Sequence, residues 1–266
     1  MAKIADAERR GAAVAVRGKP GGSATGSRVA PRAPRAAKAG GDVAAHVPLS
    51  RERIVAAALA LVDDRGLTGL TTRRLGEMLG CEAMSVYHYF PSKRHLQDAM
   101  VERAIAGIPE PAADLDPIER LRFIGWEYRA MAHRHPRLFP LIALHRLNMP
   151  AGVAFIERML CHFHAALPDD RLAAQAFRVF GYYVLGAALD ETSGSAAGPS
   201  AVPVADEFIA RECPRLVAAA PFFRRPYFES TFELGFETML KGIADLRANL
   251  LANARPPPKP VVRPKA

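Results

Sequence analysis

The sequence predicts an all-α protein, and three observations support this prediction. Apolar residues recur at helical spacing through most of residues 50–253. Residues suited to cap helices begin these stretches, and glycine or proline ends many of them. The alternating apolar and polar pattern of strands joined by hairpin turns occurs nowhere in the 266 residues. A chain of this length can form one or two domains with substantial cores.

Four helices are expected in residues 49–108, near residues 51–66, 72–79, 83–89 and 93–106. Each begins at a capping side chain or ends at a glycine or proline. These caps and stops are Ser50, Gly66, Thr71 or Thr72, Gly80, Pro91 and Ser92. The second and third helices are short and meet near Gly80, which is the geometry of a helix-turn-helix.

Residues 109–253 are expected to form a larger helical bundle. Pro109 and Pro111 mark a linker or bend, and Asp116-Pro117 then supplies a cap and a first helical position for a helix to about His135. Further helices are expected near residues 137–144, 151–167, 169–191, 204–213 and 227–253. The stretch ETSGSAAGPSAVP separates two of them and is expected to be a mobile loop.

The two ends of the chain carry most of its formal net charge of +9. Residues 1–48 have a net charge of +6 and residues 251–266 of +4, against +1 for residues 49–108 and −2 for residues 109–250. Both ends lack a hydrophobic period, so we predict a disordered basic tail at residues 1–48 and a disordered proline-rich tail at residues 254–266. Such tails attract polyanions without sequence preference. Specific DNA binding therefore needs a motif.

Composition excludes several classes of protein. No run approaches the roughly 18 apolar residues of a membrane span, and the apolar run at residues 12–16 is too short for a signal peptide. Three distant cysteines, Cys81, Cys161 and Cys213, fit a reduced cytoplasmic protein better than a disulfide framework or a zinc site. We therefore expect a cytoplasmic protein with no membrane partner.

The histidines do not predict a metal site. His133 and His135 are two residues apart, as are His162 and His164, so the members of each pair point to different helix faces. Neither HExxH nor CxxC occurs, and no nucleophile, base and acid lie in a recognisable catalytic context. We expect no metal, no cofactor and no enzymatic activity.

The helix-turn-helix carries the functional argument. Residues 71–96 read TTRRLGEMLGCEAMSVYHYFPSKRHL. Ala83, Val86 and Phe90 are spaced to face the core, which leaves the rest of the third helix outside. The outward residues are Met84, Ser85, Tyr87, His88 and Tyr89. Hydroxyl and imidazole groups with small neighbours suit a helix that enters a DNA groove, with Thr72, Arg73 and Lys93 flanking it.

Residues 50–100 resemble the N-terminal domain of the TetR family of bacterial repressors. The shared features are the apolar first helix, Gly66, TTRRLGEMLG, YHYF and PSK-x-x-L. The resemblance implies phosphate contacts for Thr72, Tyr87, Tyr89 and Lys93, and a guanine contact for Arg73. It also implies that Ala83, Met84 and Ser85 face the major groove. Ala83 cannot hydrogen-bond through its side chain and Met84 replaces a proline, so contacts with thymine methyl groups are expected here.

The resemblance weakens after residue 109. The segment YYVLGAALDE is similar to part of the tetracycline-repressor C-terminal domain, where a carboxylate at the position of Asp190 helps to hold a magnesium–drug complex. The histidine of that site has no match, because His145 is out of step. We therefore expect Asp190 to be a surface acid.

Residues 123–183 are dense in aromatic and sulfur-containing side chains, most of which should form the core. A subset with polar groups could line a pocket for a small apolar or aromatic effector. The candidates are Trp126, His133, His145, Met159, His162 and Tyr182.

A homodimer is also expected. The helix from residue 169 is apolar on two faces and so needs two partners, and the resemblance implies that the last long helices of two subunits pair. The candidate interface residues are Leu172, Val179, Tyr183, Phe232, Phe236, Met239 and Ile243.

These features predict a dimeric regulator that binds a palindromic operator in double-stranded DNA, most simply a repressor released by a small molecule. Two alternatives remain: a helical small-molecule-binding protein with a vestigial helix-turn-helix, and a protein that coats nucleic acid through its basic tails.

Overall fold

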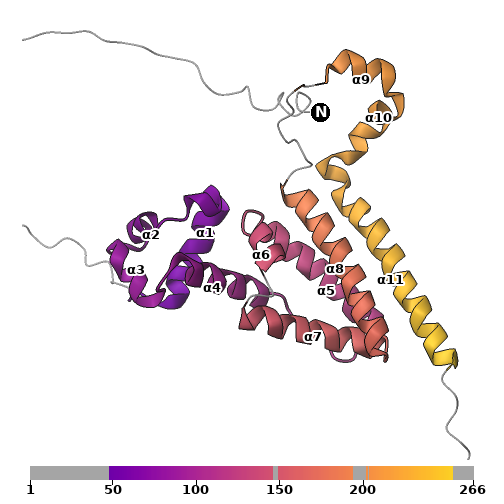
Figure 1. The fold of residues 1–266 in the computed structure, drawn as a ribbon, viewed down its shortest axis with the longest axis horizontal. Coiled ribbons are helices and arrows are strands. Elements are labelled where there is room, and N and C mark those ends of the chain that lie inside the picture. Colours follow the sequence, from indigo (N-terminus) through magenta and orange to yellow (C-terminus); the bar gives the residue numbers. More distant parts are fainter. Residues whose placement is uncertain (1–47, 146–148, 194–201, 203, 254–266) are drawn as a thin grey trace, which may run out of the picture. The chain divides into compact units, whose positions relative to one another are not determined.

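The computed structural model describes residues 48–145, 149–193, 202 and 204–253, and these contain helices but no strands. The predicted all-α fold class is confirmed (Figure 1). The elements are α1 (Arg51–Gly69), α2 (Thr72–Leu79), α3 (Ala83–Tyr89), α4 (Lys93–Ala106), α5 (Pro117–Arg134), α6 (Phe139–His145), α7 (Pro150–Ala166), α8 (Asp170–Ser193), α9 (Asp206–Glu212), α10 (Pro214–Ala219), the 3₁₀ turns η2 (Ala220–Phe223) and η3 (Arg225–Tyr227), and α11 (Phe228–Asn253). The predicted tails and most of the predicted mobile loop lie outside the described residues.

The first four helices begin and end close to the predicted caps and stops. The hydroxyls of Ser50, Thr71 and Ser92 each accept a hydrogen bond from a backbone N–H in the following first turn. Gly80 ends α2 with φ of 69°, a left-handed conformation that glycine adopts without strain. Gly66, with φ of 70°, interrupts α1 rather than ending it, and a last turn continues to residue 69.

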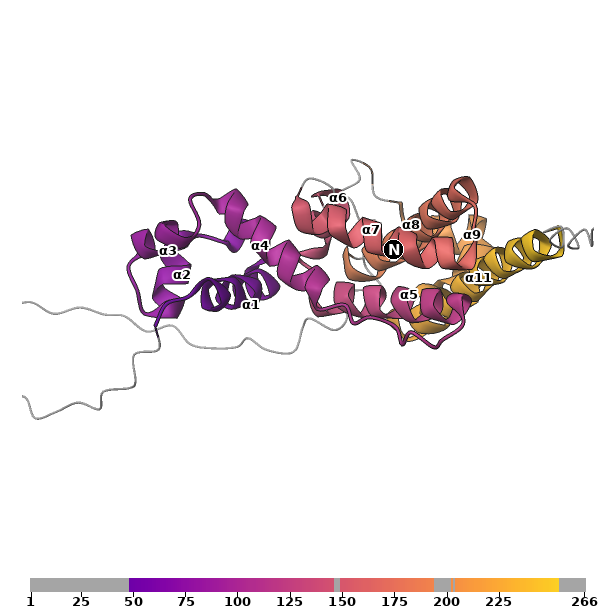
Figure 2. The same cartoon turned by 90° about the horizontal axis from the view of Figure 1, so that it is seen from below.

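Helices α1 to α4 share one apolar core. Ile54 and Val62 of α1, Leu75 of α2, and Val86 of α3 are buried together with Phe90, which follows α3. Figure 2 shows α2 and α3 side by side, with α1 and α4 packed against each other. This core fixes α3 through its inner face and leaves its outer face uncovered, as the spacing predicted.

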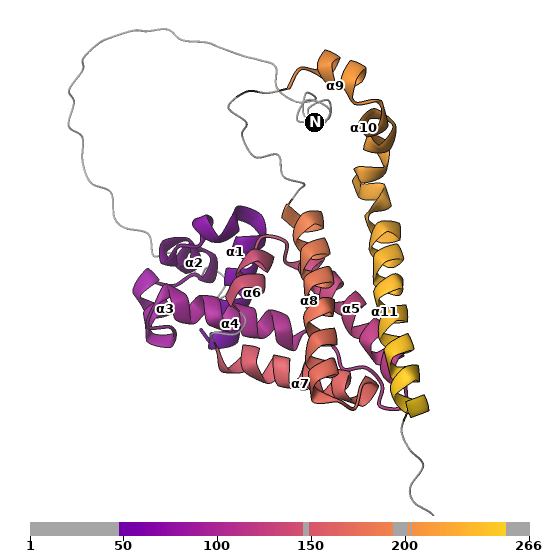
Figure 3. The same cartoon turned by 45° about the vertical axis from the view of Figure 1, so that its right-hand side comes forward.

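The larger bundle is formed by α5, α7, α8 and α11, with α6 against α8. Its centre is a chain of aromatic rings in edge-to-face or stacked contact, which is the favoured geometry for such pairs. The ring centroids of Phe163 and Phe180 are 5.3 Å apart, those of Phe180 and Phe236 are 5.7 Å apart, and those of Phe232 and Phe236 are 5.0 Å apart. Figure 3 shows α11 alongside α8, the helices that carry Phe236 and Phe180.

Two glycines allow this aromatic packing. A Cβ atom at Gly125 of α5 would lie 2.1 Å from Cζ of Phe236, and one at Gly235 of α11 would lie 2.5 Å from the hydroxyl oxygen of Tyr183. Neither position has room for a side chain. The helices therefore approach each other through these glycines, with the rings of Phe236 and Tyr183 resting on bare backbone.

The prediction that Phe232, Phe236 and Ile243 contact a second subunit is wrong. Phe232 and Phe236 are 1% and 0% exposed, and Ile243 is also buried, all within the subunit's own core. Their spacing of three or four residues marks a buried helix face but does not reveal which helices cover it. Here the cover is supplied by α5 and α8 of the same chain.

Residues 204–227 form an arm before α11 in which no residue is buried. Figures 1 and 3 show α9 and α10 of this arm at the start of α11, away from α5 and α7. Only α9 matches a predicted helix, near residues 204–213. The arm exposes the apolar side chains of Val204, Phe208, Val217, Phe222, Phe223 and Tyr227. Exposed apolar groups at this density usually mark an interaction surface.

One helix in the described part of the chain, α8, is long and apolar enough to cross a membrane, with a mean hydropathy of 1.3 in its most apolar window. It packs against α5, α6, α7 and α11, and its outer face carries Arg178. Its composition is therefore also that of a bundle helix with more than one covered face.

The turn between α5 and α6 contacts the end of α1. Nδ1 of His135, the residue that ends α5, lies 3.0 Å from Oδ2 of Asp63 in α1. The Arg137 guanidinium donates to the backbone carbonyl of Asp64. Positive side chains at the last carbonyls of a helix are favourable, so this turn helps to cap the regular part of α1.

Candidate nucleic-acid interface and effector pocket

The outer face of α3 is exposed at three of the five positions that the sequence predicted, and Ser85 and Tyr89 are half-buried. Met84 and Tyr87 are 66% and 40% exposed, and His88 is exposed as well. Ala83 and Ser85 are half-buried at the start of the helix, next to the turn that follows α2. The surface offered is therefore one apolar tip with a phenol and an imidazole beside it, which can contact thymine methyl groups and phosphate oxygens.

The cationic residues that flank this face are accessible. Arg73 of α2 is 88% exposed, and its Nε lies 3.1 Å from Oε1 of Glu77, one turn further along the helix. Such an exposed pair is weak and can exchange Glu77 for another anion. Lys93 is exposed, and its ammonium donates to the backbone carbonyl of Leu67 at 3.2 Å. Thr72 is half-buried at the first position of α2.

Tyr89 differs from Tyr87. Its ring packs partly against the core, and its hydroxyl donates to the backbone carbonyl of Leu49 at 2.7 Å. The two tyrosines lie two residues apart and therefore point to different faces of α3. Tyr87 points outward, whereas Tyr89 joins the end of α3 to the residues that precede α1.

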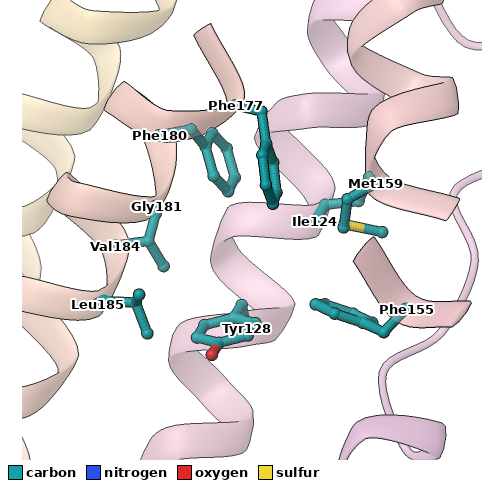
Figure 4. Close-up of a pocket in the computed structure, with 9 residues that line it drawn as sticks. All are labelled: Ile124, Tyr128, Phe155, Met159, Phe177, Phe180, Gly181, Val184 and Leu185. Atoms are coloured by element: carbon teal, nitrogen blue, oxygen red, sulfur yellow. The ribbon is translucent and has the colours of Figure 1, made fainter. Parts of the chain in front are cut away.

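The bundle contains a narrow apolar pocket between α5, α7 and α8, in which about 30 Å³ is free between the side chains. Figure 4 shows the lining residues as Ile124, Tyr128, Phe155, Met159, Phe177, Phe180, Gly181, Val184 and Leu185. The Tyr128 hydroxyl is the single hydrogen-bonding group among the side chains of these nine residues. A lining of this composition offers a ligand apolar contact and very few hydrogen bonds.

Two family models match the chain. The model described as "Bacterial regulatory proteins, tetR family" matches residues 54–100. The model described as "Tetracyclin repressor-like, C-terminal domain" matches residues 109–247, which is more than half of the chain. The chain belongs to the TetR family. The resemblance inferred from residues 50–100 is confirmed, and this TetR-family protein is a DNA-binding transcriptional regulator.

Relatives of known type agree with the family. The transcriptional repressor DrrR1 of Streptomyces coeruleorubidus is 33% identical over 143 residues, so the match spans about half of each chain, 53% of both. The class A tetracycline repressor from transposon 1721 of Escherichia coli is 29% identical over 210 residues, 75% of this chain and 92% of that protein. The structure of ActR from Streptomyces coelicolor in complex with actinorhodin has a TM-score of 0.56 and 26% identity, covering 79% of this chain and all of ActR.

Of the residues predicted to line an effector pocket, Met159 lines this cavity and four others lie elsewhere. Trp126 packs edge-on to Phe232, with ring centroids 5.0 Å apart. Tyr182 is 64% exposed on the outer face of α8, and His162 pairs with Glu110. The side chain of His145 lies outside the described part of the chain.

His133, the fourth of these, belongs to a charged cluster between α5 and α8. Oε2 of Glu191 lies 2.7 Å from Nε2 of His133 and 2.8 Å from Nε of Arg129. Only 6% of the Glu191 side chain is exposed. A carboxylate this deeply buried needs hydrogen-bond partners, so the His133 ring contacts Glu191 rather than facing the pocket.

The pocket residues missed by sequence reasoning are Ile124, Tyr128, Phe155, Phe177, Phe180, Gly181, Val184 and Leu185. They share helix faces with core residues, and a polar tip was the wrong criterion for finding them. The spacing of residues 177, 180, 181 and 184 could have predicted the pocket, because it places two phenylalanines, a glycine and a valine on one inward face of α8.

Within the described ranges, no three His, Cys, Asp or Glu side chains are grouped so that they could hold a metal ion. Cys81, Cys161 and Cys213 are free thiols. Asp190 is exposed on α8.

Proposed function

We propose that this protein is a homodimeric repressor that binds a palindromic operator and leaves it when a small apolar or aromatic molecule occupies the pocket between α5, α7 and α8. The observation that supports this proposal is that one chain has both an exposed outer face on α3, formed by Met84, Tyr87 and His88, and an apolar pocket inside the bundle. Residues 49–108 would form the DNA-binding domain and residues 109–253 the effector-binding and dimerisation domain, in the cytoplasm.

In this proposal, DNA contacts come from α2, α3 and the start of α4. Arg73 would reach a base edge, Tyr87 and Lys93 would bind phosphates, and Met84 would contact thymine methyl groups. Arg73→Ala tests the base contact. With duplexes selected from random DNA by the wild-type protein, we expect about 5- to 150-fold weaker operator binding and relaxed preference at one position. Unchanged affinity, measured by fluorescence anisotropy, would remove Arg73 from the interface.

The dimer would form through the outer faces of α8 and α11. Val179 and Tyr182 expose apolar surface on α8, and Leu234 does so on α11. A Cβ atom at Gly186 or Gly242 would meet no other atom within 4 Å, so these positions leave room for a neighbouring helix. Unlike Phe232 and Phe236, these residues are free to contact another subunit. Leu172, Tyr183 and Met239 are half-buried beside the same faces.

Light scattering combined with circular dichroism tests this interface. We expect Val179→Glu to give a folded monomer that no longer binds the operator, because a palindrome needs two reading heads. Phe236→Glu is the matched comparison, and it should unfold the subunit because the carboxylate would be buried without a partner. A wild-type protein that is monomeric at micromolar concentration would refute the dimer.

The apolar lining of the pocket and the actinorhodin bound to ActR support an apolar or aromatic effector. Because the lining offers one hydroxyl, an apolar or aromatic effector should bind mainly through apolar contact. We expect actinorhodin to raise the melting temperature of the protein without added magnesium, and Gly181→Leu, which fills the pocket, to abolish that rise. Mass spectrometry of ligand retained during purification would identify the natural effector. A melting temperature insensitive to both actinorhodin and tetracycline would argue against this class.

Release from DNA would be a shift between two conformations that the effector favours unequally. The Tyr128 ring lines the pocket and contacts the Phe139 ring at 5.8 Å, and Phe139 begins α6 directly after the turn that binds Asp63. Movement of Tyr128 would thus reach α1, while α4 connects the two domains and acts as the lever. The effector would favour a spacing of the two reading heads that does not match successive major grooves.

A further inference from the structure

Few interactions within helix α3 itself stabilise the helix or fix its orientation. It has only seven residues, too few to be stable alone, and its N-cap Glu82 makes no side-chain hydrogen bond to the helix. In contrast, α2 is capped at its N-terminus by the Thr71 hydroxyl and ended by Gly80 in a left-handed conformation. The orientation of α3 therefore depends on contacts with other parts of the domain.

Such contacts gather at the C-terminal end of α3. Nη1 of Arg51 donates to the backbone carbonyl of Tyr89 at 2.6 Å, and the Arg51 guanidinium lies 4.3 Å from the centre of the Phe90 ring. In the opposite direction, the Tyr89 hydroxyl donates to the backbone carbonyl of Leu49. We call these four residues, Leu49, Arg51, Tyr89 and Phe90, the clasp.

The sign of the charge on Arg51 supports a role toward α3. Arg51 is the first residue of α1, where the helix dipole disfavours a positive side chain. The same guanidinium lies at the last carbonyl of α3, where the dipole favours it. The charge of Arg51 therefore does not stabilise α1, and its guanidinium contacts the C-terminal end of α3 instead.

We propose that the clasp sets the angle at which α3 enters the DNA groove, and that Arg51 and Tyr89 are positioning residues rather than phosphate ligands. The proposal replaces the phosphate contact that the resemblance implies for Tyr89, because its hydroxyl donates to the backbone carbonyl of Leu49. The inference rests on the proposed role of α3 as the reading helix.

Loss of the clasp should affect specific and non-specific DNA binding differently. Non-specific affinity depends on how many phosphates are neutralised, which the angle of α3 barely affects. Operator affinity depends on base contacts made by one face of α3, and these need that angle. Loss of the clasp should therefore lower operator affinity and leave affinity for random DNA unchanged, whereas loss of a phosphate ligand lowers both.

Two tyrosines on the same short helix give a matched test. Affinities of Tyr89→Phe and Tyr87→Phe for the selected operator and for a scrambled duplex are measured by anisotropy at several salt concentrations. For Tyr89→Phe we expect about 2- to 10-fold weaker operator binding, the range of one hydrogen bond, with scrambled binding and salt dependence unchanged. For Tyr87→Phe we expect both duplexes to bind more weakly by a similar factor.

Arg51→Met and Arg103→Met form the second pair, since each removes one positive charge from the same domain and Arg103 is exposed on α4. Only Arg51→Met should lose operator preference, and Arg51→Lys, which restores the charge without the planar contact on Phe90, should recover part of it. In the free protein, amide hydrogen exchange in α3 should quicken about 2- to 10-fold for Tyr89→Phe and stay unchanged for Tyr87→Phe.

The outcomes separate the two ideas. If Tyr89→Phe or Arg51→Met weakens both duplexes equally and lowers the salt dependence, these residues are phosphate ligands and the clasp is refuted. It is also refuted if Tyr87→Phe weakens binding while Tyr89→Phe changes nothing. If none of the α3 variants changes DNA binding, the role of α3 as the reading helix fails first.

Discussion

Replacing Gly125 by alanine should destabilise the bundle although alanine is the better helix former. The added Cβ would lie 2.1, 2.7 and 3.0 Å from three ring atoms of Phe236, whereas ordinary contacts begin at 3.4 Å. The Phe236 ring cannot step aside easily, because it is fully buried and contacts the rings of Phe180, Phe232 and Tyr183 at centroid distances of 5.7, 5.0 and 6.1 Å.

The magnitude follows from two opposing contributions. Adding a methyl group to a filled core costs about 1–3 kcal/mol, and the severity of this overlap indicates the upper end of that range. The better helix propensity of alanine returns about 0.5–1 kcal/mol. We therefore expect the free energy of unfolding to fall by about 2 kcal/mol, which for a chain of this size lowers the melting temperature by about 4–8 °C.

Urea unfolding followed by far-UV circular dichroism, at one protein concentration, measures this change. Gly181→Ala is the control, because a Cβ there meets no atom within 4 Å, and it should be neutral or stabilising. In Gly125→Ala/Phe236→Leu, the smaller side chain should remove the overlap, so the double variant should be more stable than the sum of the single changes predicts. If Gly125→Ala is as stable as the wild type, the aromatic packing described here is incorrect.

Three further predictions concern charge. Arg122 binds both carboxylate oxygens of Glu237 at 2.7 and 2.8 Å and lowers the pKa of that carboxyl below its ordinary 4.5. The pair therefore stabilises the fold fully above pH 4.5, and this stabilisation is lost as the pH falls through the lowered pKa. Glu237→Gln should cost about 0.5–1 kcal/mol at pH 7, and the difference in urea midpoint between the variant and the wild type should vanish in acid. Arg129→Met leaves the buried Glu191 carboxylate short of one partner and should cost about 3–5 kcal/mol, much of which Arg129→Met/Glu191→Leu should recover in the same unfolding assay. Deleting residues 1–46 removes a net charge of +6 and should weaken both non-specific DNA binding and its salt dependence while operator preference is kept. Gel-shift titrations at two salt concentrations measure these changes. If a folded truncated protein no longer binds the operator, the tail itself recognises sequence.

Local signals were enough to predict the helix-turn-helix. The caps at Ser50 and Thr71 and the stop at Gly80 act within a few residues of where they stand, so the sequence places these helix ends almost correctly. The outward face of α3 followed from the spacing of Ala83, Val86 and Phe90, of which the last two are buried.

The bundle depended on contacts between distant residues, which periodicity does not reveal. The stripe containing Phe232 and Phe236 showed that one face of α11 is buried, yet the same stripe fits a core or a subunit interface. Nothing near Gly125 in the sequence shows that a glycine is required there, because the ring that contacts it belongs to Phe236, more than a hundred residues away. Likewise, His133 suggested a pocket because its buried partner, Glu191, comes from another helix.

The single tryptophan of the chain, Trp126, gives the protein an optical probe of its own. Its indole lies edge-on to Phe232 and 5.5 Å from the Arg129 guanidinium, in the seam between α5 and α11. The reading face of α3 carries tyrosine and histidine instead. If α3 binds DNA as proposed, indole fluorescence does not respond to DNA by direct contact, and any change in emission on adding DNA reports movement within the bundle. Communication between the two domains is thus measurable in the unlabelled protein.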